Sequence, residues 1–245
     1  MNASNAPLEA VIFDMDGTSL DTPHAQYSWL KQTAQRYGGL DPFPAFGAGF
    51  LEMYNDWLTR KKMPGLYEMI GVDYTGNRDA IHRDYDLFNQ THPIELIPGM
   101  PECIKQFKDF GFKLGVNTTK NMKSISAPLA RYGLTDLFDA YVTADDILAQ
   151  AERTGLPHTE FAKPHGYSAE LILRKLDVAQ ENAAAIEDDT IGVTTYRNGS
   201  AQPRVIGVTW GFEPDGKRLL DAGADIVAHT TGELITAIML RAHRR

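Results

Sequence analysis

The stretch AVIFDMDGT, residues 10–18, decides the fold class of this chain of 245 residues. Four apolar residues in a row, at positions 10–13, are typical of a short strand that is buried on both faces of a parallel sheet. Asp14 and Asp16 follow at once, and Gly17 lets the backbone leave the strand without a side chain in the way. Ligands bind beyond the carboxyl ends of such strands, so the two carboxylates are candidates for chemistry. An ordinary turn with two solvated aspartates would also explain this stretch taken alone.

Five further apolar runs follow along the chain, and helical patterns separate them. The runs are residues 112–116, 140–142, 183–186, 205–208 and 226–228. Their alternation with helices predicts an α/β fold, a Rossmann-like, doubly wound parallel sheet covered on both faces. The helices predicted in this part are residues 101–110, 126–132, 167–176 and 217–222.

The segment from residue 22 to residue 96 differs, because it is rich in aromatic residues and has no clear strand pattern. Proline and glycine breakers divide it into four helical patterns, residues 24–37, 45–60, 65–70 and 77–90. We therefore predict a small all-helical cap domain over residues 22–96. It is inserted after the first strand of an α/β core that comprises residues 1–21 and 97–245.

The composition excludes several classes of protein. A hydrophobic fraction of 43% and a charged fraction of 23% are ordinary for a globular chain. The formal net charge of −8 argues against nonspecific binding to nucleic acid or to an anionic membrane. The single cysteine, Cys103, excludes an internal disulfide and a cysteine-based metal site. No apolar run approaches the ~20 residues of a membrane span, and no signal-peptide pattern is present, so we expect a cytoplasmic protein.

Further polar groups stand at or near the predicted strand ends. Glu187, Asp188 and Asp189 follow the fourth apolar run, Thr118 ends the second, and Lys163 lies shortly before a predicted helix. Adjacent acids repel one another unless a cation compensates, and oxygen ligands favour a hard ion such as Mg²⁺. A hydroxyl and an ammonium group suit a bound phosphoryl group. Each group also fits a plain structural role, and Asp189 suits the N-cap of a following helix.

In this order, the polar groups resemble the motifs of the haloacid dehalogenase-like hydrolase superfamily, in its phosphoglycolate phosphatase and β-phosphoglucomutase-like branch. The resemblance covers about residues 9–234. Residues 11–18 match the first motif closely, and residues 187–189 are similar to the fourth, which usually reads Glu-Asp-Ser. Two departures stand out: Ser19 replaces a usually apolar residue, and residues 145–163 look like a polar insertion before the third motif.

The resemblance implies a Mg²⁺-dependent phosphatase that hydrolyses a small phosphorylated metabolite, such as phosphoglycolate or a sugar phosphate, through an aspartyl phosphate. Asp14 would be the nucleophile, and Asp16 the general acid and then the general base. Asp14, Asp16 through its main-chain carbonyl, and Asp188 would hold Mg²⁺, with Glu187 as a further candidate. Lys163 and Thr118 would bind the phosphate, and Asn117 or Thr119 are alternatives for the second-motif contact.

Three rival functions remain open from the sequence. A phosphomutase of the same branch would use the same aspartates and a sugar hydroxyl in place of water. A phosphonatase-like enzyme would need a cap lysine, for which Lys31, Lys61 and Lys62 are available, but such enzymes usually carry Arg at the position of Lys163. A non-enzymatic phospho-acceptor module is disfavoured, because receiver domains are about half this length. The candidates for substrate contact in the cap are Tyr54, Arg60, Lys61, Arg78, His82 and Arg83. Neither the substrate nor the oligomeric state can be read from these motifs.

Overall fold

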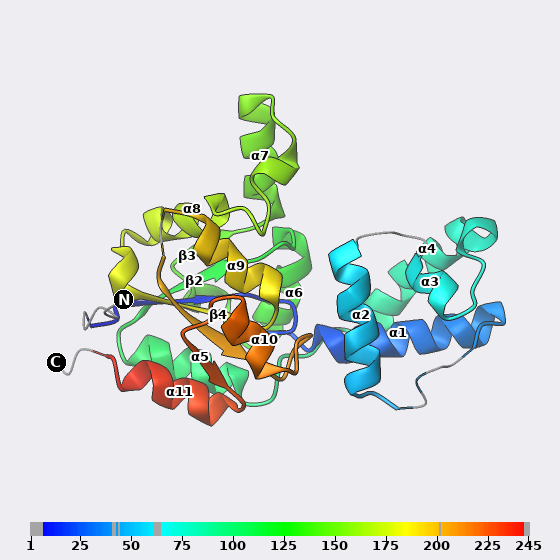
Figure 1. Cartoon of the computed structure of the whole chain (residues 1–245), viewed down its shortest axis with the longest axis horizontal. Coiled ribbons are helices and arrows are strands. Elements are labelled where there is room, and N and C mark those ends of the chain that lie inside the picture. Colours follow the sequence, from blue (N-terminus) through cyan, green and yellow to red (C-terminus); the bar gives the residue numbers. More distant parts are fainter. Residues whose placement is uncertain (1–6, 41–42, 44, 61–64, 201, 243–245) are drawn as a thin grey trace. The chain divides into compact units, whose positions relative to one another are not determined.

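The computed structural model describes residues 7–40, 43, 45–60, 65–200 and 202–242 (Figure 1). Its contacts divide the chain into two compact units, which we call the core unit (residues 1–20 and 96–245) and the helical unit (residues 21–95). The described helices include none with the length and apolarity that crossing a membrane requires.

Six parallel strands form the sheet of the core unit, in the order β3-β2-β1-β4-β5-β6 (Figure 1). The strands are β1 (Ala10–Phe13), β2 (Lys113–Asn117), β3 (Ala140–Val142), β4 (Ala183–Glu187), β5 (Arg204–Val208) and β6 (Ile226–Ala228). Strand β1 lies between β2 and β4, and Phe13 is in register with Val116 on one side and Ile186 on the other. The order reverses at β1, which creates the switch point where ligands bind in open α/β sheets. The predicted doubly wound parallel sheet is confirmed.

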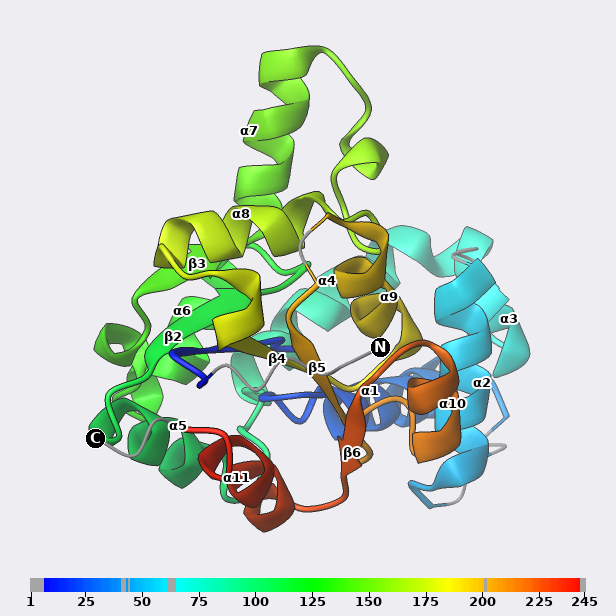
Figure 2. The same cartoon turned by 60° about the vertical axis from the view of Figure 1, so that its left-hand side comes forward.

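Helices cover both faces of this sheet (Figures 1 and 2). They are α5 (Met100–Asp109), α6 (Met122–Arg131), α7 (Ala144–Thr154), α8 (Tyr167–Leu176), α9 (Thr190–Asn198), α10 (Gly216–Asp221) and α11 (Thr231–Met239). Short 3₁₀ turns lie at Thr135–Leu137, His158–Glu160 and Gln180–Asn182. Helix α8 packs so closely on β2 that a Cβ atom at Gly115 would press on the side chains of Ile172 and Leu176. The glycine in the strand therefore allows a close helix-to-sheet contact.

Three helices of the core unit, α7, α9 and α11, lie outside the four predicted ranges, and of α9 only the N-cap candidate, Asp189, was named. The polar insertion expected over residues 145–163 begins with helix α7, which projects from the core unit (Figure 2). A capping box of Thr143 and Asp146 starts this helix. Ala144, Ile147, Leu148 and Ala151 follow the spacing of an amphipathic helix, although Ile147 is the one residue of the helix that is buried. Helix α11 ends in a nearly continuous apolar run, which by itself does not distinguish a helix from a strand.

The regular elements described in the helical unit are α1 (Thr22–Tyr37), α2 (Ala48–Arg60), α3 (Gly65–Met69) and α4 (Tyr74–Thr91). Aromatic rings fill its interior. The ring of Trp29 lies 5.1 Å from that of Tyr85 and 5.4 Å from that of Phe88, measured between ring centroids. The indole nitrogen of Trp29 donates a hydrogen bond of 3.2 Å to the hydroxyl of Tyr67. The aromatic residues that mark this segment in the sequence thus supply its packing.

Candidate active site

The carboxyl ends of the three central strands bring three of the polar groups into one row. Phe13 is in register with Val116 and Ile186, so the residues that follow, Asp14, Asn117 and Glu187, stand side by side. Side chains alternate between the faces of a strand, so this row points to the face that carries α8 and α9. The row is buried: Asn117 is 0% exposed, Glu187 1% and Asp14 7%.

Lys163 reaches into this row from the loop before α8 and joins two carboxylates. Its Nζ atom lies 2.8 Å from Asp14 Oδ1 and 2.8 Å from Glu187 Oε1. Burial raises the pKa of Asp14 to about 6, although the charge of Lys163 acts to lower it. Burial also favours a neutral Lys163, but the two carboxylates outweigh it and raise the lysine pKa well above its usual value. The site thus holds a buried ammonium group between two acids.

Asp188 is held by a separate set of donors. Its Oδ1 atom accepts a hydrogen bond of 2.9 Å from the hydroxyl of Thr18, and its Oδ2 atom accepts one of 2.7 Å from the main-chain N–H of Phe212. A Cβ atom at Gly17 or Gly211 would collide with this carboxylate. Gly17 also has a φ of +76°, which favours glycine. Two glycines therefore let the backbone close around Asp188 and fix its orientation.

Asp16 and Thr118, two further predicted site residues, differ in exposure. Asp16 Oδ1 is 3.1 Å from the Nζ atom of Lys120, and both side chains are partly exposed. Thr118 is buried, and its Oγ1 atom accepts a hydrogen bond of 3.2 Å from the main-chain N–H of Lys120. Of the alternatives to Thr118, Asn117 donates to the hydroxyl of Tyr196, and Thr119 is exposed. Thr118 as the residue of the second motif stays a prediction.

Whether these residues fit a metal ion depends on whether main-chain oxygens are counted together with side-chain carboxylates. Within the described part of the chain, no group of three or more His, Cys, Asp or Glu side chains could hold a metal. The predicted set needs only two carboxylates, because Asp16 would enter through its main-chain carbonyl. The pKa of Asp188 is raised well above its ordinary value by burial, and further by the charges of Asp189 and Asp14. Oxygen donors whose negative charge is poorly compensated fit a hard cation such as Mg²⁺.

Sequence reasoning missed several residues that shape the site. Ser19, the unusual residue after the first motif, donates a hydrogen bond of 2.8 Å to the main-chain oxygen of Asp14. Trp210 donates from Nε1 to the main-chain oxygen of Thr18 at 3.0 Å. Trp210 and Gly211 resemble the C-terminal region of the family branch, but that resemblance gave neither of them a contact at the site. Asp189 does cap α9, as expected, because it accepts a hydrogen bond of 2.6 Å from the N–H of Gly192.

The family model of the haloacid dehalogenase-like hydrolases matches residues 8–198, which is most of the chain and includes the whole first, second, third and fourth motifs. The chain is a haloacid dehalogenase-like hydrolase. The predictions of the family, of the α/β fold and of an enzyme of the hydrolase class are thereby confirmed.

Similar proteins extend over nearly the whole length of this hydrolase. The phosphorylated carbohydrates phosphatase of Thermotoga maritima is 27% identical over 228 residues, which are 89% of this chain and 92% of that protein. Pyrophosphatase PpaX of Bacillus cereus is 24% identical and is covered over 88% of each chain. The structure of a HAD family hydrolase from Deinococcus radiodurans, with bound phosphate and sodium, has a TM-score of 0.68 at 19% identity. It covers 96% of this chain and 97% of that chain, a likeness that shows the fold.

The residues suggested for substrate contact in the helical unit of the hydrolase differ in exposure. Arg78, His82 and Arg83 are exposed on α4, whereas Tyr54 is buried inside the unit. The side chain of Arg60, and Lys61 altogether, lie outside the described residues. Contact of any of them with substrate stays a hypothesis.

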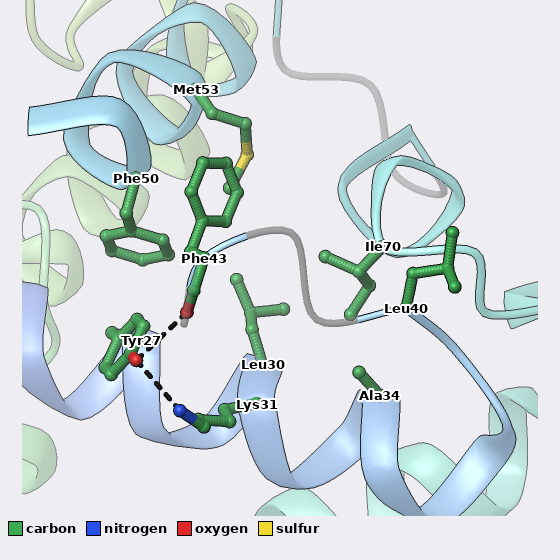
Figure 3. Close-up of a pocket in the computed structure, with 9 residues that line it drawn as sticks. All are labelled: Tyr27, Leu30, Lys31, Ala34, Leu40, Phe43, Phe50, Met53 and Ile70. Carbon is green, nitrogen blue, oxygen red and sulfur yellow. Dashed lines mark hydrogen bonds between the residues drawn. The ribbon is translucent and has the colours of Figure 1, made fainter. Parts of the chain in front are cut away.

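Of the three lysines that a phosphonatase-like enzyme could use, Lys31 lies within the described residues. Its side chain belongs to a packed cluster in the helical unit (Figure 3). Its Nζ atom donates a hydrogen bond of 3.2 Å to the hydroxyl of Tyr27, which in turn donates one of 3.0 Å to the main-chain oxygen of Phe43. The cavity beside these residues has a volume of about 10 Å³, roughly the space of one water molecule. This cavity is too small for a substrate. Lys62, like Lys61, lies outside the described residues.

Proposed function

We propose that this hydrolase is a Mg²⁺-dependent phosphatase that acts on a small phosphorylated metabolite, such as a phosphorylated carbohydrate, through an aspartyl phosphate. The observation that carries the proposal is the position of the Lys163 Nζ atom, 2.8 Å from both Asp14 and Glu187 at the end of the central strand. The site thus offers a carboxylate nucleophile and a cation for phosphate oxygens in one buried place. The names of the two relatives, a phosphatase and a pyrophosphatase, support a phosphorylated small molecule as substrate.

In the first step, a carboxylate oxygen of Asp14 attacks the phosphorus atom of the substrate. A new bond forms between oxygen and phosphorus, and the bond from phosphorus to the ester oxygen breaks. Asp16, protonated at this stage, gives its proton to the departing oxygen, so the product leaves as an alcohol. The hydroxyl of Thr118 and the ammonium group of Lys163 hold the transferred oxygens in line for the attack.

In the second step, water attacks the phosphorus atom of the aspartyl phosphate. Asp16 is now a carboxylate and accepts a proton from this water, while the bond between phosphorus and Asp14 breaks. The products are inorganic phosphate and the regenerated Asp14. Lys120, whose Nζ atom lies 3.1 Å from Asp16 Oδ1, would hold the Asp16 carboxylate in place for this second proton transfer.

Asp14, the main-chain carbonyl of Asp16 and Asp188 would hold Mg²⁺, with Glu187 close by. When bound, this ion would offset the negative charge that builds up between the nucleophile and the phosphate. The hydrogen bonds from Thr18 and Phe212 prepare Asp188 for this role, because they fix both of its oxygen atoms before a ligand arrives.

The helical unit would act as the cap that selects the leaving group. Its place in the chain, between β1 and β2, supports this assignment. We expect the cap to decide whether water or a substrate hydroxyl takes the phosphoryl group, which is the difference between a phosphatase and a phosphomutase.

The test is a measurement of phosphate release from phosphorylated sugars, phosphoglycolate and pyrophosphate, with Mg²⁺ and after chelation. We expect release from at least one of these compounds, loss of release with EDTA, and recovery when Mg²⁺ is added back. Following the same mixtures by ³¹P NMR separates phosphate release from isomerisation of the sugar phosphate. Full activity after chelation would exclude the metal, and isomerisation without free phosphate would favour the mutase.

A further inference from the structure

A buried tyrosine lies behind the ion pairs of the site, and the mechanism above does not use it. Tyr196 is 0% exposed and sits on α9, the helix that follows Glu187. It lies four residues after Gly192, so both face the same side of the helix. A Cβ atom at Gly192 would collide with Oε2 of Glu187, which places the Glu187 carboxylate against this face. Tyr196 therefore lies one helical turn after Gly192, the point at which the Glu187 carboxylate approaches α9.

The hydroxyl of Tyr196 reaches across the central strand. It accepts a hydrogen bond of 3.0 Å from the Nδ2 atom of Asn117, which is the last residue of β2. Strand β1 with Asp14 lies between β2 and β4, so Asn117 and Glu187 stand on opposite sides of Asp14. Tyr196 and Asn117 together thus extend along the row of Asp14, Asn117 and Glu187. They lie on the face of the sheet that carries α8 and α9.

This pair is polar where the surrounding core is apolar. Tyr196 packs in one cluster with Ile12, Ile172 and Val193, and the other polar atom of the Asn117 side chain, Oδ1, has no hydrogen-bond partner among the described residues. A buried polar group without a partner costs stability, and two apolar residues would avoid that cost. A role at the neighbouring site explains why an amide and a phenol stand here instead.

The charges that act on the Tyr196 hydroxyl belong to the same site. Burial raises the pKa of Tyr196, and the charge of Glu187 raises it further, while Lys163 lowers it. The hydroxyl is therefore a neutral dipole at the edge of the charged triad. Because the hydroxyl oxygen accepts the hydrogen bond from Asn117, its own O–H group is left to orient toward these charges.

We propose that Tyr196 and Asn117 are positioning residues of the phosphoryl-transfer site, whose hydrogen bond keeps the Lys163 ammonium group between Asp14 and Glu187. The inference rests on the proposed phosphatase function. Without the hydroxyl, Asn117 loses its hydrogen-bond partner beside Asp14, and the ammonium group of Lys163 loses a neighbouring dipole. Small displacements of a group that orients the reacting phosphate slow the chemical step more than they weaken binding.

The test uses Tyr196→Phe, which keeps the ring and removes the hydroxyl, with Tyr141→Phe as the matched control. Tyr141 lies on the edge strand β3 and its hydroxyl donates a hydrogen bond of 2.8 Å to the main-chain oxygen of Thr135. We expect Tyr196→Phe to lower kcat by about tenfold with KM nearly unchanged. Asn117→Ala should lower kcat to a similar extent, and Tyr141→Phe should leave it unchanged. A kcat of Tyr196→Phe within about twofold of wild type would overturn the proposal.

A second measurement tests the link to Lys163 without any assay of activity. Denaturant midpoints are compared for wild type, Tyr196→Phe, Lys163→Met and the double variant. If Tyr196 acts on Lys163, the midpoint shifts of the two single variants do not add in the double variant. Additive shifts would contradict the proposal. A wild-type protein that releases no phosphate would refute the phosphatase function, while this cycle would still decide whether Tyr196 and Lys163 are coupled.

Discussion

The two units of the chain bury different kinds of side chain. The core unit encloses the ammonium group of Lys163 together with the carboxylates of Asp14, Glu187 and Asp188. Among the described residues of the helical unit, the buried set holds rings, aliphatic groups and the hydroxyls of Thr22 and Thr33, but no charged side chain. Burying charge costs desolvation energy, whereas burying rings stabilises a fold. The core unit is therefore organised around a charged site, and the helical unit around its own packing.

The largest expected effect is on turnover. Replacing Asp14 by Asn keeps the size of the side chain but removes the nucleophile, so we expect phosphate release to fall at least about 10³-fold. Circular dichroism should show an intact fold, because Lys163 keeps Glu187 as a partner. Asp109→Asn, at an exposed carboxylate on α5, is the control and should behave as wild type. Wild-type rates in Asp14→Asn would rule out the nucleophile.

The next effect is on stability and separates buried charge from surface charge. Lys163→Met leaves the Asp14 and Glu187 carboxylates buried without their cation, and we expect a loss of about 3–5 kcal/mol in the free energy of unfolding. The control is Lys175→Met, which breaks a partly exposed pair with Asp146 and should cost about 0–1 kcal/mol. Denaturant unfolding in EDTA measures both. Equal losses would show that burial does not set the strength of these pairs.

The loss of unfolding free energy in Lys163→Met should also depend on pH. Burial raises the pKa of Asp14 and of Glu187, and Lys163 acts to lower both, so the pKa of each rises further without it. Acids with a raised folded pKa stabilise the fold at low pH, and this contribution is lost as the pH rises through that pKa. The deficit of the variant should therefore grow from about pH 5 to about pH 8. A deficit that shrinks over this range would contradict the assignment.

The smallest effect concerns the aromatic interior of the helical unit. Tyr67→Phe leaves the buried indole N–H of Trp29 without its acceptor, and we expect a loss of about 1–3 kcal/mol. Tyr85→Phe is the control, since its hydroxyl takes part in a long contact of 3.5 Å with Gln26. Hydrogen exchange should show reduced protection in residues 21–95 and unchanged protection in the sheet. Equal loss in the sheet would mean that the two interiors are not independent.

Much of the fold could be predicted because it follows from local patterns. Short apolar runs gave all six strands, and the four helical patterns predicted for residues 22–96 each overlap a described helix. Helix α4 begins at Tyr74, inside the predicted breaker of residues 71–76. Three helices were missed for different reasons. Helix α7 has the spacing of an amphipathic helix but lies in a polar segment that was read as an insertion, and helix α11 is apolar along most of its length. Of helix α9 only the N-cap, Asp189, was indicated.

The site could be predicted as a set of residues but not as a set of contacts. The sequence by itself determined the kinds of group at the strand ends, because each lies directly after an apolar run or before a helix. Only the tertiary structure decided that Lys163, 149 positions away, meets Asp14, and that the loop with Phe212 closes on Asp188. It also decided that the side-chain amide of Asn117 donates a hydrogen bond to Tyr196, 79 positions away. Local periodicity reports which face a residue occupies, whereas a partner distant in the chain depends on how sheet, helices and loops pack together.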